Sequence, residues 1–142
     1  MFNRYIDEPR LTCEFRDAAA AFLVELTAEL SNYCEVAYDN IWMNWYRDHR
    51  DSAGWHADRP ANVPPTATVP VVSLGATRRF LIPPSSVGRS TTFIPAGGDA
   101  LIMRGRCQRD RRHCAPKQQT PAGPRMSLNF GSTAQVNSSS PD

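Results

Sequence analysis

The sequence lacks several features that would place it in common protein classes. No apolar run approaches the roughly 20 residues with which a helix crosses a bilayer. No charged N-terminal region precedes an apolar segment, so a signal peptide is not expected. No internal repeat is evident. The chain of 142 residues is close to the size of one ordinary domain. We therefore expect one soluble, cytoplasmic and monomeric domain over residues 1–131, with no membrane contact and a disordered tail over 132–142.

Paired cysteine motifs are also absent. The four cysteines, Cys13, Cys34, Cys107 and Cys114, show no C-x-x-C spacing, so a structural zinc site is not expected. Reduced thiols are the expected state in the cytoplasm.

A strong net charge is missing as well. The 16 basic and 14 acidic residues leave a net charge of +2, which does not by itself indicate a nucleic-acid-binding protein. The arginines are nevertheless clustered, at Arg104, Arg106, Arg109, Arg111 and Arg112 and at the adjacent pair Arg78 and Arg79. Two interpretations stay open for such a cluster, a solvated loop or a rim that contacts phosphate groups.

The secondary structure pattern changes after residue 40. An Ala-rich stretch from Asp17 to about Leu30 predicts a helix with Asp17 as its N-cap and Ala19, Phe22, Leu23, Leu26 and Leu30 on one face. Short strands are predicted at 41–46, 54–58, 69–74, 79–82, 91–94, 100–103 and 126–130, with a polar turn at 47–52. One helix followed by many short strands predicts a mainly β fold with a supporting helix, built as a double-stranded β-helix or jelly roll.

The motif that most clearly indicates a chemical function is His56-Ala57-Asp58, together with His113, which lies 57 positions after His56. Two histidines and one carboxylate form the facial triad that holds non-haem Fe(II) and leaves other positions open. Because side chains alternate along a strand, His56 and Asp58 can point at one metal ion. His113 must then come from a strand that is distant in sequence and near in space.

Arg125 follows His113 by 12 residues and shares one face of the last predicted strand with Ser127, Asn129 and Gly131. Its forked guanidinium suits a carboxylate such as that of 2-oxoglutarate. A buried arginine without an anion would be costly, so either the site binds an anion or Arg125 is exposed. With a triad nearby we favour the anion site.

Other residues near the predicted site have two interpretations. Asn44 and Tyr46 share a strand face that either looks into the metal pocket or is half-buried with the hydroxyl in solvent. Trp55 either forms a wall of the substrate pocket, where it stacks on a base, or packs in the core. His49 lies in a charged turn and is interpreted as a solvated residue.

These blocks together resemble the AlkB family. Residues 44–58 are similar to its N-x-Y-x-D-G-x-D-x-x-x-x-H-x-D block, and residues 124–130 to its closing R-x-x-x-x-F-R strand. Residues 72–80, and 98–109 with His113, resemble the intervening segments, and residues 8–12 resemble the start of short actinobacterial-type members. The similarity runs from about residue 5 to residue 130.

The resemblance implies a double-stranded β-helix dioxygenase that uses Fe(II), 2-oxoglutarate and O2. It implies that the iron ligands and catalytic residues are His56, Asp58 and His113, and that 2-oxoglutarate contacts Asn44, Tyr46, Arg125 and Ser127. The implied reaction removes N-alkyl groups from bases of DNA or RNA, in a single strand or after base flipping, with Trp55, Arg78 and Arg79 as candidate substrate contacts. An oxygenase acting on a protein or small molecule, or a catalytically silent relative, is the alternative.

The sequence departs from the family pattern at three places. Gly131 stands where the closing strand has its second arginine. Pro60 stands two positions after the metal carboxylate, where repair members have an acidic residue. The segment before the helix is short in this sequence, so by this resemblance we expect a reduced lid for nucleotide recognition.

Overall fold

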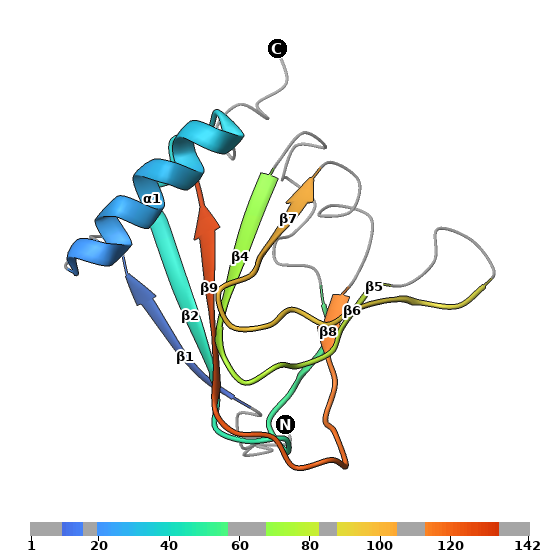
Figure 1. Ribbon diagram of the computed structural model, residues 1–142. Coiled ribbons are helices and arrows are strands. Elements are labelled where there is room, and N and C mark those ends of the chain that lie inside the picture. The colour runs from blue at the N-terminus through green and yellow to red at the C-terminus, as the bar shows by residue number, and fades with distance from the viewer. Residues whose placement is uncertain (1–9, 16–19, 57–67, 83–87, 105–112, 134–142) are drawn as a thin grey trace, which may run out of the picture.

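The computed structural model describes residues 10–15, 20–56, 68–82, 88–104 and 113–133 (Figure 1). Within these ranges the chain forms one helix and nine strands. In chain order they are β1 (Leu11–Phe15), α1 (Ala21–Cys34), β2 (Asn40–Tyr46), β3 (Ala53–His56), β4 (Thr68–Gly75), β5 (Phe80–Ile82), β6 (Thr91–Phe93), β7 (Ala100–Arg104), β8 (His113–Ala115) and β9 (Arg125–Gly131). Within the described part of the chain, no helix is long and apolar enough to cross a membrane.

The strands form two antiparallel sheets. The larger sheet has the order β1-β2-β9-β4-β7, and the smaller sheet has the order β3-β8-β5-β6. Helix α1 lies across the face of the larger sheet that is turned away from the smaller sheet (Figure 1). This arrangement confirms the predicted mainly β fold with a supporting helix and a jelly-roll core.

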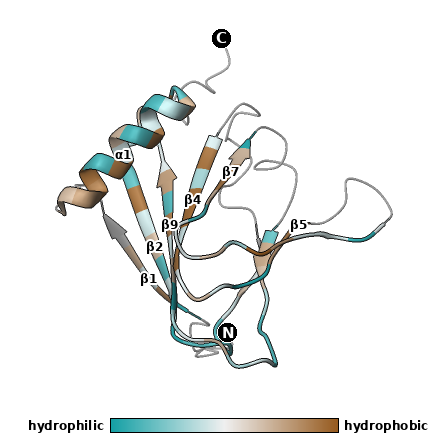
Figure 2. Ribbon diagram, viewed as in Figure 1, coloured by the Kyte–Doolittle hydropathy of each residue, from teal (hydrophilic) through white to brown (hydrophobic). Residues whose placement is uncertain are grey.

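Alternation along the strands separates two apolar clusters. Leu23 and Leu30 of α1 pack on Ile41, Val72, Leu128 and Phe130 of the larger sheet. A second cluster, formed by Val69, Val71, Phe80, Ile82 and Met103, draws residues from both sheets. Hydrophobic and hydrophilic bands alternate along β2 and β4 (Figure 2).

In β9 the residues that alternate with Leu128 and Phe130 are polar and yet buried. A buried polar row of this kind requires partners, and it marks the position of the candidate site.

The helix differs from its prediction at both ends. It begins at Ala21, with Ala20 as an N-cap that makes no side-chain hydrogen bond, and the predicted cap Asp17 lies outside the described residues. It continues to Cys34, and the following Glu35 adopts a left-handed conformation with φ of 56°. The predicted apolar face is wrong at Phe22, which is 56% exposed.

Strand β1 was not identified from the sequence, and β8 was expected only as the strand that carries His113, without bounds. Strand β1 pairs with β2 along its whole length, and β8 pairs with β3 and β5.

The predicted disordered tail is wrong at its first two residues. Ser132 is buried, and the backbone N–H and hydroxyl of Thr133 donate hydrogen bonds to the carboxylate of Asp39. Residues 134–142 lie outside the described part of the chain.

Arg78 holds together the segments that flank the smaller sheet. Its side chain is 1% exposed. Its terminal nitrogens donate to the carbonyl oxygens of Asp48 at 2.9 Å, Asp51 at 2.7 Å and Pro116 at 2.8 Å. Asp51 also accepts bonds from the backbone N–H and guanidinium of Arg47, which hold the pKa of its carboxyl below the usual value. One buried cation thus fixes the turn before β3 against the segment after β8.

Gly75 allows a close approach between the end of β4 and the start of β9. Its φ is +86°, and a Cβ atom would lie 2.5 Å from the carbonyl oxygen of Pro124. Gly98 has a similar φ of +94°, but no described atom lies within 4 Å of the position that its Cβ atom would take. The φ of Gly54 is not positive, and the position of its Cβ atom is equally open. Alanine substitutions at these three glycines therefore distinguish the energetic cost of backbone strain from that of a steric clash.

We expect Gly75→Ala to lower the free energy of unfolding by at least about 3 kcal/mol, because strain and clash add. Gly98→Ala should cost about 1–2 kcal/mol, from strain alone. Gly54→Ala should stay within about 0.5 kcal/mol of wild type. Urea denaturation followed by circular dichroism measures all three, and equal losses at Gly75 and Gly98 would contradict the steric argument.

We expect Arg78→Met to lower the free energy of unfolding by about 2–4 kcal/mol, because three carbonyl groups each lose one charged donor. Arg79→Met is the matched control, since Arg79 is exposed and should tolerate the change within about 0.5 kcal/mol. The measurement is again chemical denaturation. A similar stability for both variants would show that the three carbonyl contacts contribute little.

Candidate cosubstrate and metal site

A pocket lies between the two sheets, and most of its lining comes from the predicted site segments. The larger sheet contributes Asn44, Tyr46, Val71, Arg125, Ser127 and Asn129, and the smaller sheet contributes Ala53, Phe80, His113 and Ala115. The polar rows of β2 and β9 therefore meet one of the two predicted metal histidines in a single pocket. The interpretation that places Asn44 and Tyr46 on a pocket-facing strand face agrees with this geometry.

The pairing of β3 with β8 brings the two histidines together. His56 and His113 are direct Cα partners in this antiparallel pair, although 57 positions separate them in the sequence. His113 is buried, and its ring stacks on Phe80 at a centroid distance of 5.2 Å. The strand pairing thus fits two ligands of one metal ion.

The third predicted ligand, Asp58, lies outside the described residues, as does the side chain of His56. Within the described part of the chain no group of three His, Cys, Asp or Glu residues could hold a metal ion. The facial triad therefore stays a prediction that the backbone position of its two histidines supports.

Arg125 is a buried cation without a carboxylate partner among the described residues. Its side chain is 3% exposed, so the exposed alternative left open by the sequence does not apply. One terminal nitrogen donates to Ser73 Oγ at 2.9 Å, and Nε is buried without a hydrogen-bond partner among the described residues. Burial lowers the pKa of Arg125, the nearby charge of Arg78 lowers it further, and the phenol of Tyr46, which also forms a side-chain hydrogen bond with Arg125, opposes this shift. Such a guanidinium fits a ligand that brings its own carboxylate.

Tyr46 lies beside this cation. Its ring centroid is 5.2 Å from the guanidinium carbon of Arg125 and 5.4 Å from that of Arg78. Burial raises the pKa of Tyr46, although the positive charges of Arg125, Arg10 and Arg78 oppose this shift. The phenol is therefore protonated at neutral pH and can donate a hydrogen bond to an anion.

The polar row of β9 is connected to β2 by side-chain hydrogen bonds. Asn44 Nδ2 and Asn129 Nδ2 each donate to Ser127 Oγ at 3.3 Å. Asn129 Nδ2 also donates to the carbonyl oxygen of Trp42 at 3.1 Å. The pocket wall next to Arg125 is thus an ordered set of hydrogen-bonding groups.

The predicted substrate contacts have three different positions. Arg78 is buried and bonded to carbonyl groups, so a role in contacting substrate does not fit its position. Arg79 is exposed and lies in an open depression with Lys117, Gln118, Gln119 and Thr120. The side chain of Trp55 lies outside the described residues. His49, interpreted as a solvated turn residue, is partly exposed in the turn after β2.

The basic cluster near residue 104 is described only at its first member. Arg104 is exposed at the end of β7, whereas residues 105–112 lie outside the described part of the chain. The choice between a solvated loop and a phosphate-contacting rim therefore stays open for this cluster.

Ser73 and Arg10 are pocket-related residues that the sequence analysis did not identify. Ser73 is 1% exposed and accepts the hydrogen bond from Arg125. Its signal in the sequence is a hydroxyl within the otherwise apolar stretch Val-Pro-Val-Val-Ser-Leu, which follows Thr68 in β4. Arg10 donates from Nε to Asn44 Oδ1 at 3.0 Å, and no local pattern indicates that contact.

Comparison with known proteins agrees with this fold. Residues 4–134 match the 2OG-Fe(II) oxygenase superfamily. The chain is 28% identical over 130 residues to "Alpha-ketoglutarate-dependent dioxygenase alkB homolog 3" of Mus musculus, a match that covers 85% of this chain and 46% of that protein. It is 30% identical to the Bos taurus protein of the same name, with the same coverage. It is also 29% identical over 116 residues to "DNA oxidative demethylase ALKBH2" of Arabidopsis thaliana, covering 66% of this chain and 37% of that protein.

The solved structure of OsALKBH1 has the same fold, with a TM-score of 0.54 and 19% identity over 76% of this chain and 61% of that one. The chain spans about half the length of the alkB homolog 3 proteins that it matches. The family match nevertheless covers nearly all of this chain. The chain therefore belongs to the 2OG-Fe(II) oxygenase superfamily as an AlkB-like member, and the cofactor and cosubstrates of that family are Fe(II), 2-oxoglutarate and O2.

Proposed function

We propose that this protein is an Fe(II)/2-oxoglutarate-dependent dioxygenase that removes N-alkyl groups from nucleobases of DNA or RNA. The observation that carries the proposal is the buried guanidinium of Arg125, which lacks a described carboxylate partner and shares a pocket with His113. A dicarboxylate cosubstrate would supply the missing negative charge. The names of the curated relatives, an alkB homolog and a DNA oxidative demethylase, support nucleic acid as the substrate.

The chain supplies two sets of residues for this reaction. His56, Asp58 and His113 would hold Fe(II), since β3 and β8 place the two histidines opposite each other. Arg125 would bind the distal carboxylate of 2-oxoglutarate, and the protonated hydroxyl of Tyr46 would donate to the same group. Asn44 and Ser127 would complete the polar wall beside it. When bound, iron and its cosubstrates supply the oxidation, in which 2-oxoglutarate and O2 yield succinate, CO2 and a hydroxylated alkyl group that leaves as an aldehyde.

The protein would also exclude water from the pocket. Phe80 stacks on His113, and Val71, Ala53 and Ala115 line the same pocket with apolar groups. A dry site strengthens the interaction between Arg125 and a carboxylate, because the local dielectric constant is low. A base in a duplex would have to leave the stack to reach such a site, so a single strand or a flipped base is the proposed substrate form.

Contacts with the nucleic-acid backbone would come from the exposed basic residues. Arg79 and Lys117 lie together at one open depression, and Arg104 is exposed at the end of β7. Positive groups of this kind neutralise phosphates without reading the sequence. Arg79 therefore stays a candidate substrate contact, with Trp55 as the candidate for base stacking.

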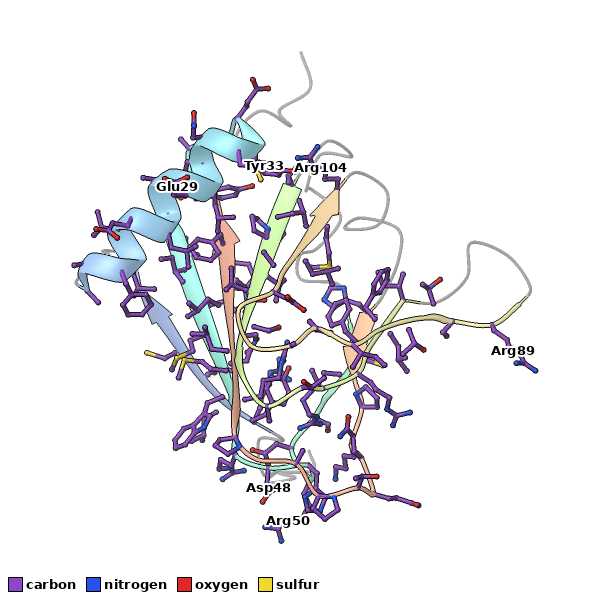
Figure 3. All side chains as sticks on the ribbon, viewed as in Figure 1. Glu29, Tyr33, Asp48, Arg50, Arg89 and Arg104 are labelled. Carbon is purple, nitrogen blue, oxygen red and sulfur yellow. The ribbon has the colours of Figure 1, made fainter. Side chains whose placement is uncertain are left out.

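We expect Arg125→Met to weaken 2-oxoglutarate binding by about 10- to 100-fold, because a charge-assisted pair is lost. The free energy of unfolding without ligand should stay equal to wild type or rise, since a buried charge without a counter-ion is removed. Thermal denaturation with Mn(II), with and without 2-oxoglutarate, measures both effects. Arg89→Met is the control, because Arg89 points away from the body of the protein (Figure 3). Ligand-induced stabilisation that persists in Arg125→Met would exclude Arg125 from the cosubstrate site.

Activity is tested on a single-stranded oligonucleotide that carries 1-methyladenine or 3-methylcytosine, with Fe(II), 2-oxoglutarate and ascorbate. We expect mass spectrometry to show loss of one methyl group with wild type and no loss with His56→Ala or Asp58→Ala, because each variant removes a proposed metal ligand. Succinate formation without demethylation would point to another substrate class. If folded, metal-loaded wild type forms no succinate, the protein is a catalytically silent relative and the proposal fails.

A further inference from the structure

Arg10 contacts Asn44, a residue that lines the pocket, although Arg10 stands next to the edge strand of the larger sheet. It directly precedes β1, in which Leu11 and Thr12 are the Cα partners of Trp45 and Asn44. Arg10 is partly buried, and its Nε donates to Asn44 Oδ1 at 3.0 Å. Its positive charge also opposes the rise in the pKa of Tyr46. Arg10 therefore acts on two residues of the pocket side of β2.

The contact with Arg10 fixes the orientation of the Asn44 amide. A guanidinium can only donate hydrogen bonds, so the atom of Asn44 that faces it must be the carbonyl oxygen. The amide nitrogen is then directed to the other side, where it donates to Ser127 Oγ at 3.3 Å. Without Arg10, either end of the amide could face Ser127, because a hydroxyl can donate as well as accept.

The orientation of the Asn44 amide determines which hydrogen bonds remain for the hydroxyl of Ser127. A serine hydroxyl has one proton to donate and two lone pairs that accept. Ser127 Oγ accepts from Asn44 Nδ2 and from Asn129 Nδ2, so both lone pairs are used within the protein. Its own proton is left for another acceptor, and Ser127 lines the pocket two positions after Arg125 on the same strand. The hydroxyl is thus prepared to donate to an anion beside Arg125.

We propose that Arg10 is a positioning residue of the cosubstrate site, which sets the direction of the hydrogen-bond chain from Arg10 through Asn44 to Ser127 so that Ser127 presents a donor to the 2-oxoglutarate carboxylate. This inference rests on the proposed function, because it requires that the pocket binds 2-oxoglutarate. An opposite direction of the chain would present an oxygen lone pair to a carboxylate, and two acceptors repel each other. A purely structural role of Arg10, which would only attach β1 to β2, predicts a change in stability and no change in affinity.

Isothermal titration calorimetry of the Mn(II)-loaded protein with 2-oxoglutarate tests the proposal without catalysis. We expect Arg10→Ala to raise the Kd about tenfold, through the loss of one oriented donor. Arg10→Lys should restore most of the affinity, because an ammonium group also only donates. Asn44→Asp keeps the contact with Arg10 but replaces the donor by an acceptor, and it should weaken binding more than Arg10→Ala. Arg89→Ala removes the same charge at a distant exposed position and should leave the Kd unchanged.

A double-mutant cycle separates positioning from general electrostatic attraction. If Arg10 acts through Ser127, Arg10→Ala should raise the Kd by less than about twofold in the Ser127→Ala background. Additive effects of the two substitutions would overturn the proposal, as would a Kd of Arg10→Ala equal to that of wild type. Should Arg10→Ala not fold, Arg10→Gln replaces it in the cycle. If wild type itself does not bind 2-oxoglutarate, the proposed function and this inference fail together, whereas normal binding by every Arg10 variant overturns this inference alone.

Discussion

The structure depends on a positive charge that is held in the space between two sheets. Arg125 is 3% exposed, and among the described residues it has no carboxylate partner. Desolvation of a guanidinium is costly, and hydrogen bonds to the neutral hydroxyls of Ser73 and Tyr46 do not replace a counter-ion. The fold tolerates this cost because the larger sheet is completed by apolar packing on its other face, where Leu128 and Phe130 meet α1. Packing against α1 thus stabilises the larger sheet, whereas its pocket face keeps a buried positive charge that has no described counter-ion.

The two buried arginines show how burial alone fails to identify a binding residue. Arg78 is even less exposed than Arg125, yet its terminal nitrogens donate to three carbonyl oxygens. Among the described residues, Arg125 bonds to the hydroxyl of Ser73 and interacts with Tyr46 but binds no carbonyl group. The Nε atoms of both arginines are buried without a described partner, so they do not distinguish the two side chains. Because carbonyl dipoles satisfy Arg78, a further anion would add little there. The difference in hydrogen bonding, rather than in exposure, indicates a structural role for Arg78 and supports the proposed ligand-binding role of Arg125.

Alternation and spacing predicted most of the strands and the polar rows of β2 and β9, because both patterns are local. The buried position of Arg78 could not be predicted, since Arg79 beside it has the same chemistry, and the carbonyl partners of Arg78 lie 27 to 38 positions away. Strand β1 was not predicted although Leu11, Cys13 and Phe15 alternate with polar residues, because five residues are a weak signal and the pairing with β2 is not visible in the local sequence. The start of α1 has no capping side chain, so the Ala-rich sequence contains no signal for it.

The pocket requires residues from two sheets, and Arg78 is the residue that connects them. The carbonyl groups that it binds belong to the turn before β3 and to Pro116 directly after β8, the two strands that carry His56 and His113. Its guanidinium also lies 5.4 Å from the ring of Tyr46 in the larger sheet. A shift of the histidine strands would therefore disturb the same cation that lies against the cosubstrate side of the pocket. This shared contact gives a physical reason why the proposed metal-binding and carboxylate-binding halves of the site would keep a fixed relative position, even though their residues are far apart in the sequence.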